Sequence, residues 1–277
     1  KNMNKLDAYK MDGLGNDFII FDRRTKSISL TKDEIIKISD RKHIGCDQVV
    51  FIDKDKNDNN FLRFYNSDGG KISACGNGSR CAAYLLMNQE GIKKISFKTE
   101  AGTLHAELDG KQLIVINIGQ PEFEWKKIPL SKEMDNKNLG IKINSLDKKE
   151  VVGGFSLSVG NPHVVFFVED FNQFNLSMLG PEIENHNYFP EKCNVTLASI
   201  KDKKNVKIKV WERGAGLTKA CGTAACATVV AGSVLKLLER SVDIEFPEGL
   251  LNIDWKMDNN IYMKGRVSEI KKIIVNI

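Results

Sequence analysis

The sequence is poor in the features that mark several large classes of protein. It has no apolar run that approaches the roughly 18 residues of a membrane-spanning helix, and no apolar signal segment at its start. It has no C-x-x-C pair and only four histidines, which argues against zinc-binding and thioredoxin-like sites. Its net charge of +5 comes from scattered lysines, without a basic helix interleaved with aromatic residues. We therefore expect no membrane segment and no nucleic-acid partner.

The cysteine content indicates a reducing compartment. Six cysteines are distributed over 277 residues, which is too sparse for a disulfide scaffold. Because disulfides are rare in reducing compartments, reduced thiols fit a cytoplasmic location best. A chain of this length, with 42% hydrophobic residues, can bury either one large core or two medium ones.

The chain aligns with itself over most of its length. When Cys75 is placed on Cys221, the segment FLRFYNSDGGKISAC meets KIKVWERGAGLTKAC without a gap. TEAGTLHAEL likewise meets FPEGLLNIDW, VINIG meets IYMKG, and near the start GNDFIIF meets GNPHVVF. The shift stays at 145 to 147 residues, far longer than the period of a solenoid repeat. The sequence therefore predicts two structurally equivalent halves.

Each half has the same order of expected elements. Alternating apolar strands end at a glycine-containing turn, a cysteine follows, and a helix comes next, expected at 79–89 and at 223–239. Strands dominate elsewhere, as in KQLIVINIG and NVKIKVWE. We therefore predict an α+β fold of two pseudo-symmetric domains. Each would be a curled, barrel-like and mostly antiparallel sheet around one central helix.

The repeat also sets the expected domain boundaries. The second domain is expected at 121–267, and the segment 120–133 is expected to connect the halves. The apolar strand 270–277 is left over after the second repeat, and an unpaired apolar strand is unfavourable in water. We expect it to complete the first sheet, so that the first domain comprises 1–120 plus 268–277.

Cys75 and Cys221 each stand directly before a central helix. A helix N-terminus carries unpaired N–H groups and a positive dipole end, so it lowers the pKa of a thiol and binds carboxylates. If the halves meet symmetrically, the two thiols face one substrate carbon from opposite sides. One thiolate then removes a proton and the other thiol delivers one, which inverts that carbon.

The remaining cysteines have a simpler explanation. A cysteine without such a setting is most often a small buried apolar residue. We expect this role for Cys46, Cys81, Cys193 and Cys226.

Several motifs together resemble those of the diaminopimelate epimerase family: MDGLGNDF, YNSDGG, ACGNGSRC, GNPH and ERGAGLTKACGTAAC. The matches run from residue 11 to about residue 226. The resemblance implies the fold of that family and a PLP-independent isomerase that needs no cofactor and no metal. Such an enzyme converts LL-2,6-diaminopimelate to the meso form in lysine and peptidoglycan biosynthesis. The resemblance also implies that the protein forms a homodimer. It further implies that the molecule bound by the protein is a small amino acid substrate.

The roles of the family's site residues carry over wherever the motifs match. Cys75 and Cys221 would be the catalytic acid–base pair. Amides suit a zwitterionic end, Arg213 can pair with a carboxylate bidentately, and Glu212 can accept a hydrogen bond from an ammonium group. The substrate-binding residues implied by the resemblance are Asn16, Gln48, Asn66, Gly76, Asn77, Asn161, Asn194, Glu212, Arg213, Gly222 and Thr223, with His163 as a supporting residue.

Other functions on the same fold remain open. Racemases of proline and of histidine and epimerases of hydroxyproline share this architecture, whereas the related isomerase of phenazine synthesis lacks the paired thiols. Glu212 and Arg213 favour a substrate with a second amino acid end over proline. An alternative of another class is a thiol redox or metal-binding protein. The sequence departs from the family at Ala224, where glycine is usual, and the family varies at Ala74.

Overall fold

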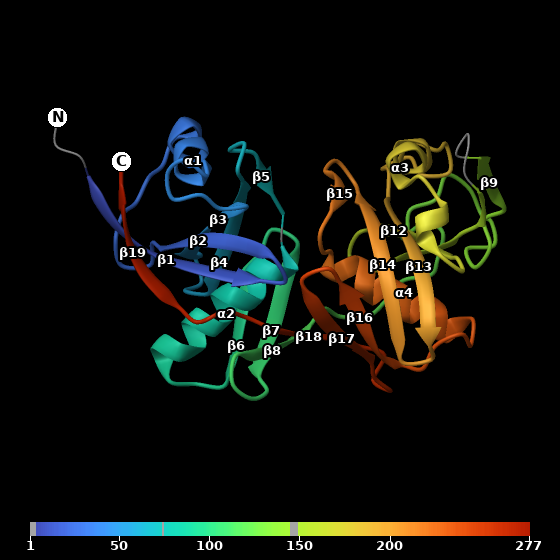
Figure 1. Cartoon of the computed structure of the whole chain (residues 1–277). Helices are drawn as coiled ribbons and strands as arrows, with labels where there is room; N and C mark the ends of the chain where they lie inside the picture. The colour runs from blue at the N-terminus through green and yellow to red at the C-terminus, as the bar shows by residue number, and fades with distance from the viewer. Residues whose placement is uncertain (1–3, 74, 145–148) are drawn as a thin grey trace. The chain divides into compact units, whose positions relative to one another are not determined.

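The computed structural model describes residues 4–73, 75–144 and 149–277, which form two compact units (Figure 1). The first unit comprises Lys1–Ile116 and Lys264–Ile277, and the second comprises Asn117–Met263. The segment 120–133, expected to connect the halves, lies in the second unit, where Glu122 pairs with Ser158 in an isolated bridge.

The first unit is a mixed sheet with two helices. Antiparallel pairs join β1 to β2, β3 to β4, β4 to β5 and β6 to β7, while β2–β3 and β4–β6 are parallel. Its elements are β1 (Lys5–Gly13), β2 (Asn16–Asp22), α1 (Lys32–Ser39), β3 (Gln48–Lys54), β4 (Asn60–Asn66), β5 (Lys71–Ile72), α2 (Gly76–Glu90), β6 (Lys94–Thr99), β7 (Gly102–Leu108), β8 (Leu113–Asn117) and β19 (Lys271–Asn276).

The C-terminal strand belongs to the first sheet. β19 pairs antiparallel with β1, in a register that runs from Lys5 opposite Asn276 to Lys10 opposite Lys271. Val275 is fully buried in this pairing, whereas its neighbour Ile274 is 59% exposed. The last strand of the chain thus contributes to the core formed by the first.

The second unit repeats this order of pairings. Antiparallel pairs join β11 to β12, β13 to β14, β14 to β15 and β16 to β17, while β12–β13 and β14–β16 are parallel. β9 and β10 form a separate antiparallel pair. Its elements are β9 (Ile141–Asn144), β10 (Glu150–Gly153), β11 (Phe155–Ser158), β12 (Pro162–Phe167), η1 (Phe171–Gln173), α3 (Leu176–Glu184), β13 (Asn194–Asp202), β14 (Asn205–Glu212), β15 (Gly216–Thr218), α4 (Gly222–Val234), β16 (Ser241–Phe246), β17 (Gly249–Trp255) and β18 (Ile261–Arg266), which continues into the first unit.

Each unit has one helix that many strands contact. In the first unit, α2 packs against β1, β2, β3, β4, β6 and β7. In the second, α4 packs against β11, β12, β13, β16 and β17. Every residue of α4 from Ala224 to Gly232 is buried, as expected for a helix that is apolar on all sides. The predicted α+β fold, with one central helix in each half, is confirmed.

The second central helix is shorter than the sequence suggested. We predicted it to reach Glu239, but α4 ends at Val234. Lys236 adopts a left-handed backbone with φ of 61°, and the N–H of Leu237 donates to the carbonyl of Gly232 at 2.8 Å. In this left-handed turn, backbone N–H groups beyond the helix donate to carbonyls of its last turn, and the helix stops there.

Four of the cysteines are core residues, as predicted. Cys46 is 2% exposed, and Cys81, Cys193 and Cys226 are completely buried. Burial raises the pKa of the Cys81 and Cys193 thiols, which keeps them protonated. Within the described part of the chain, no helix has the length and apolar character needed to cross a bilayer.

Candidate active site

In the first half, Cys75 is the N-cap residue of the central helix. Its sulfur accepts a hydrogen bond from the backbone N–H of Gly78 at 3.5 Å. A Cβ atom on Gly78 would lie 3.1 Å from the ring of Phe64 and 3.2 Å from that of Phe18. Because a side chain there would crowd both rings, glycine lets the helix start approach the sheet with its N–H directed at the sulfur.

Four of the predicted polar residues of the first half form two hydrogen-bonded pairs. Asn77 donates through Nδ2 to Oδ1 of Asn16 at 2.9 Å, and Gln48 donates through Nε2 to Oδ1 of Asn66 at 3.1 Å. Gln48 and Asn66 face each other in the register of β3 and β4. The Oε1 atom of Gln48 is buried and has no hydrogen-bond partner among the described residues. A buried acceptor of this kind is available to a ligand donor.

A network of charged residues holds Asn16 in place. Asp47 accepts hydrogen bonds from Nδ2 of Asn16 at 3.4 Å and from the backbone N–H of Asp17 at 3.0 Å. Asp17 pairs with Arg41 at 2.6 Å and with Lys10 at 2.8 Å. Although partial burial acts to raise it, the hydrogen bonds from Arg41 and Lys10 hold the pKa of Asp17 well below its usual range. The start of β2 is therefore fixed by charge-assisted hydrogen bonds.

In the second half, Cys221 is the N-cap residue of α4. Its sulfur lies 3.6 Å from Oγ1 of Thr223, which also accepts a hydrogen bond from Nδ2 of Asn161 at 3.3 Å. A Cβ atom on Gly222 would lie 2.6 Å from Sδ of Met263, so a side chain there would force Met263 to move. The structure therefore brings the predicted residues Asn161, Gly222 and Thr223 to the Cys221 thiol.

His163 supports this group from the core. Its Nε2 lies 2.9 Å from Oδ1 of Asn161 and 3.1 Å from Oγ1 of Thr223. Complete burial, with a smaller effect from the positive charge of Arg213, lowers the pKa of His163 to about 3. The imidazole is therefore neutral at pH 7, and its Nε2–H donates to Asn161, which fixes that amide and the nearby hydroxyl.

Asn194 fixes the loop that follows β14. Its Nδ2 donates to the carbonyl of Pro162 at 3.0 Å, and its Oδ1 accepts the backbone N–H of Arg213 at 2.8 Å. The guanidinium of Arg213 donates from Nη1 to the carbonyl of Glu191 at 3.1 Å. Asn194 thus positions Arg213, whose remaining guanidinium donors lie at the exposed end of the loop.

Glu212 sets the electrostatic environment of Cys221. Burial raises the pKa of the Glu212 carboxyl, while the neighbouring polar groups of Thr218 and Cys221 act to lower it. Burial, and then the negative charge of Glu212, raise the pKa of Cys221 well above its usual value, against the hydroxyl of Thr223 and the N–H of Ala224. Our expectation of a lowered pKa is wrong for Cys221, because burial and the acidic neighbour outweigh the helix N-terminus.

The strand registers place the two sets of residues at equivalent positions. Gln48 lies opposite Phe18 of β2 and Asn66 of β4. Asn194 lies opposite His163 of β12, and the β13–β14 register places it opposite Glu212. The first set is Asn16, Gln48, Asn66, Cys75 and Asn77, and its counterparts in order are Asn161, Asn194, Glu212, Cys221 and Thr223. Each half therefore assembles its own part of the predicted site.

Three acidic residues of the site were missed in the sequence. Asp17 and Asp47 hold Asn16, while Glu184 accepts from Nε1 of Trp211 at 2.8 Å and from the N–H of Gly214 at 2.9 Å. Asp17 and Asp47 stand beside predicted residues in GNDF and GCDQ, which was a usable signal. Glu184 lies in a helix far from any motif, so the sequence gave no signal of its role.

The residue at which the sequence departs from the family lies in the core. Ala224 is buried in the first turn of α4, where an ordinary helical residue is required and alanine fits well. Ala74 lies outside the described residues. Among the described residues, no group of three or more histidine, cysteine, aspartate or glutamate side chains is arranged to hold a metal ion.

Comparisons with known proteins identify one family along nearly the whole chain. The family model described as diaminopimelate epimerase matches residues 8–124 and 155–270. The chain is 50% identical over 272 residues to the diaminopimelate epimerase of Pelagibacter ubique (strain HTCC1062), covering 98% of this chain and 99% of that protein. It is 41% identical over 270 residues to that of Caulobacter sp. (strain K31), covering 94% and 93%.

Similarity to solved structures extends to more distant proteins and shows the fold alone. A phenazine biosynthesis protein of the PhzF family from Enterococcus faecalis superposes with a TM-score of 0.67 and 13% sequence identity, over 99% of this chain and 100% of that one. Given the family match along nearly the whole chain, this chain belongs to the diaminopimelate epimerase family.

Proposed function

We propose that this protein epimerises LL-2,6-diaminopimelate to meso-diaminopimelate without a cofactor, using Cys75 and Cys221 as its two acid–base residues. The observation that carries the proposal is that each half has a cysteine at the N-cap of its central helix and polar residues at equivalent strand positions. Inversion of one carbon needs one group on each face, and a repeated domain supplies two such groups. The membership in the family supports the same reaction.

The proton transfers follow from the two thiol environments. Cys75 acts as a thiolate that the N–H of Gly78 stabilises, and it removes the α-proton of the LL-epimer. The electron pair of the broken C–H bond remains on carbon and is delocalised into the carboxylate. Cys221, which burial and Glu212 keep protonated, then donates its proton to the opposite face. The reverse reaction begins with the protonation states exchanged.

The helix starts stabilise the carbanion. The turns Gly76–Asn77 and Gly222–Thr223 leave backbone N–H groups unpaired at the N-termini of α2 and α4. These groups would donate to the carboxylate next to the reacting carbon, where negative charge develops during proton removal. Because the charge is stabilised by fixed N–H groups, the reaction in this proposal requires neither pyridoxal phosphate nor a metal.

The other end of the substrate needs its own contacts. The guanidinium of Arg213 is exposed at the end of β14 and offers donors in the planar arrangement that suits a carboxylate. Asn66 and Gln48, with the buried and unpaired Oε1 atom of Gln48, would bind ammonium and carboxylate groups in the first half. Such contacts would favour diaminopimelate over proline or histidine, whose side chains lack a second amino acid end.

The proposal also extends to the setting of the reaction. We place the protein in the cytoplasm as a homodimer, acting in the biosynthesis of lysine and peptidoglycan precursors. The support is the resemblance to the family and the content of reduced, buried cysteines. Sedimentation of the purified chain at several concentrations tests the dimer directly.

The decisive experiment measures exchange of the α-proton. The purified protein, dialysed against a chelator, is incubated with LL-diaminopimelate in deuterium oxide, and the product is followed by NMR and by chiral chromatography. We expect deuterium to enter the α-position of meso-diaminopimelate without any added cofactor. Proline and histidine serve as parallel substrates. Racemisation of either one in preference to diaminopimelate would replace this function by the related racemase.

A further inference from the structure

The two sheets have equivalent regions in the two halves, and one of these regions differs between them. In the first half, β4 pairs with β5 at Phe64 and Tyr65, and with β6 at Phe61. The edge of β4 between those contacts is covered by ion pairs. Glu100, just beyond β6, pairs with Lys71 on β5 and, at 3.5 Å, with Arg63 on β4. These ion pairs link β5 to β6 across the gap between them.

The second half keeps only one charged group of these three. β14 pairs with β15 at Val210–Glu212 and with β16 at Asn205–Lys207, which leaves the same gap. The registers place Lys209 where the first half has Arg63 and Leu217 where it has Lys71. The β16–β17 register places Pro247 where the first half has Glu100. Among the described residues, no ion pair like those of Glu100 therefore links β15 to the end of β16 in the second half.

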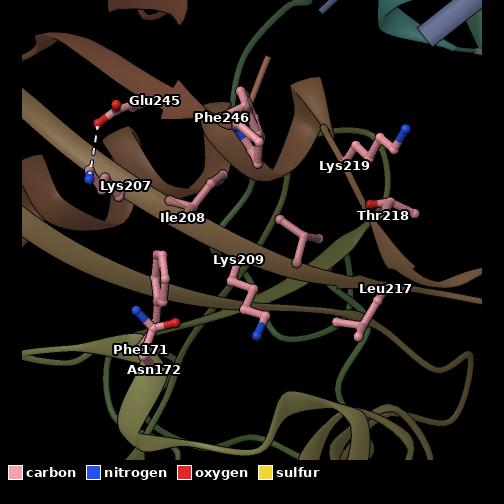
Figure 2. A pocket seen from close by; sticks show the side chains of 12 residues that line it. Phe171, Asn172, Lys207, Ile208, Lys209, Leu217, Thr218, Lys219, Glu245 and Phe246 are labelled. Atoms are coloured by element: carbon pink, nitrogen blue, oxygen red, sulfur yellow. Dashed lines mark ion pairs between the residues drawn. The ribbon is translucent and has the colours of Figure 1, made fainter. Parts of the chain in front are cut away.

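A groove of about 490 Å³ occupies the gap (Figure 2). Figure 2 shows its side chains around β14, with the Lys207–Glu245 ion pair at one end and Lys219 at the other. The groove is lined by Phe171, Asn172, Lys207, Ile208, Lys209, Val210, Leu217, Thr218, Lys219, Glu245, Phe246 and Pro247. All of these residues belong to the second unit.

The chemistry of the groove is apolar and positive. Leu217 is 45% exposed and lies in the groove with Phe171 and Pro247, so apolar surface remains uncovered. Lys207 pairs with Glu245 at 3.7 Å. Among the described residues, Lys209 and Lys219 form no ion pair, so two cations of the groove lie outside the Lys207–Glu245 pair. An anion with an apolar body complements both features.

We propose that this groove binds a small carboxylate with an apolar body, in a site separate from the reacting thiols. The carboxylate would take the place that Glu100 holds in the first half, beside Lys209, with Lys219 adding positive charge at one end of the groove. The apolar body would cover Leu217 and Phe171. The proposal goes beyond epimerisation and does not depend on it, because the groove is defined by the contrast between the halves.

Octanoate is the probe for the test, titrated into the full chain by isothermal calorimetry. We expect saturable binding, tighter than that of octan-1-ol, which has the same apolar body without the charge. Lys209→Ala should weaken octanoate binding by about five-fold, the value of one partly exposed ion pair. Lys201→Ala, a change at an exposed lysine on β13 outside the groove, is the matched control and should bind like the parent.

A second variant rebuilds the first half's ion pair. Leu217→Lys with Pro247→Glu should close the groove and remove octanoate binding. Leu250→Lys is its control, because Leu250 is a 54% exposed leucine outside the groove. Circular dichroism and the thermal midpoint report whether each variant is folded. If the double variant does not fold, Lys209→Ala and the comparison with octan-1-ol still decide the question.

Four results would overturn the proposal. The first is that octanoate shows no saturable binding to the parent, and the second is that it binds undiminished to a folded Leu217→Lys, Pro247→Glu variant. The third is that octan-1-ol binds with the same affinity as octanoate, and the fourth is that octanoate and diaminopimelate compete for one site. A dimer that dissociates in the double variant, without octanoate binding to the parent, would assign the groove to a second copy of the chain instead.

Discussion

The carboxyl group of Glu212 lies near enough to the thiol of Cys221 for its negative charge to raise the pKa of that thiol. After burial, this neighbour is the main cause of the raised pKa of Cys221. The equivalent position in the first half is Asn66, whose amide carries no charge. A difference of one residue type between repeats therefore provides a physical reason for Cys221 to start as the acid of the proposed pair.

Glu212→Gln tests this electrostatic control. The substitution keeps the shape of the side chain and removes its charge, so the pKa of Cys221 should fall. More Cys221 would then be thiolate at a given pH, and alkylation by iodoacetamide, followed at that residue by mass spectrometry, should be faster at pH 8. Because the proposed acid would lose its proton at a lower pH, the alkaline limb of the kcat/KM profile should move to lower pH.

Glu191→Gln is the matched control for that experiment. Glu191 is exposed, and only its backbone carbonyl contacts the site, through Arg213. Removing the charge of Glu191 should leave both the alkylation rate of Cys221 and the pH profile of kcat/KM unchanged. If Glu212→Gln also leaves them unchanged, the charge of Glu212 does not control Cys221.

Asp17→Asn tests the charged network under Asn16. The ion pairs with Arg41 and Lys10 depress the pKa of Asp17, so their stabilisation is complete above its unfolded pKa of about 3.9 and is lost as pH falls through the folded value. At pH 7 we expect the variant to lose about 1.5–3 kcal/mol of unfolding free energy. The difference from the parent should shrink steadily below about pH 4.

Urea unfolding at pH 7 and at pH 3 measures this effect. Asp7→Asn is the control, because Asp7 forms an ion pair with Lys26 in which both side chains are about 70% exposed. Exposed pairs of this kind contribute less than about 1 kcal/mol. An Asp17→Asn variant as stable as Asp7→Asn at pH 7 would show that the network does not stabilise the site.

The two-half architecture was readable from the sequence because the repeat preserves chemistry as well as pattern. Cys75 and Cys221 recur with glycine and a helix start, and both are N-cap residues in the structure. The helices α1 and α3, which lie at equivalent places in the two halves, were missed. The helix at Lys32–Ser39 had a usable signal in Thr31 and Glu34, which form a capping box.

Contacts between distant segments could not be read in the same way. Glu184 lies in α3 but holds Trp211 and Gly214, and nothing in its local sequence indicates this role. The raised pKa of Cys221 depends on burial, which a motif does not report. The early end of α4 depends on a left-handed residue, Lys236, that is neither glycine nor asparagine.

Val275→Ala tests the contribution of the last strand to the first unit. Val275 is completely buried where β19 pairs with β1, so removing two methyl groups should cost about 2 kcal/mol of unfolding free energy. Ile274→Ala, at a 59% exposed position one residue away, removes more carbon but should cost much less. Denaturant unfolding of both variants gives the comparison. Equal losses would mean that burial in this pairing is not what stabilises the strand.

Oxidation should switch the enzyme off reversibly. If Cys75 and Cys221 act on one carbon, they are close enough in the working enzyme to be joined by a mild oxidant, which would remove both bases at once. We expect epimerase activity to disappear after treatment and to return with dithiothreitol. Activity that resists the oxidant, or that never returns, would count against two thiols sharing one substrate carbon.

Cys75→Ser and Cys221→Ser separate proton transfer from recognition. Serine is close to cysteine in size but far less acidic, so each variant should lose epimerisation in both directions by orders of magnitude. The remaining thiol can still take a proton from its own face. One variant should therefore still eliminate fluoride from a β-fluoro analogue, because elimination needs only proton removal. Arg213→Ala should mainly raise KM, since its proposed contact is with the end that does not react. If both serine variants epimerise near the parent rate, the two cysteines serve only to begin their helices.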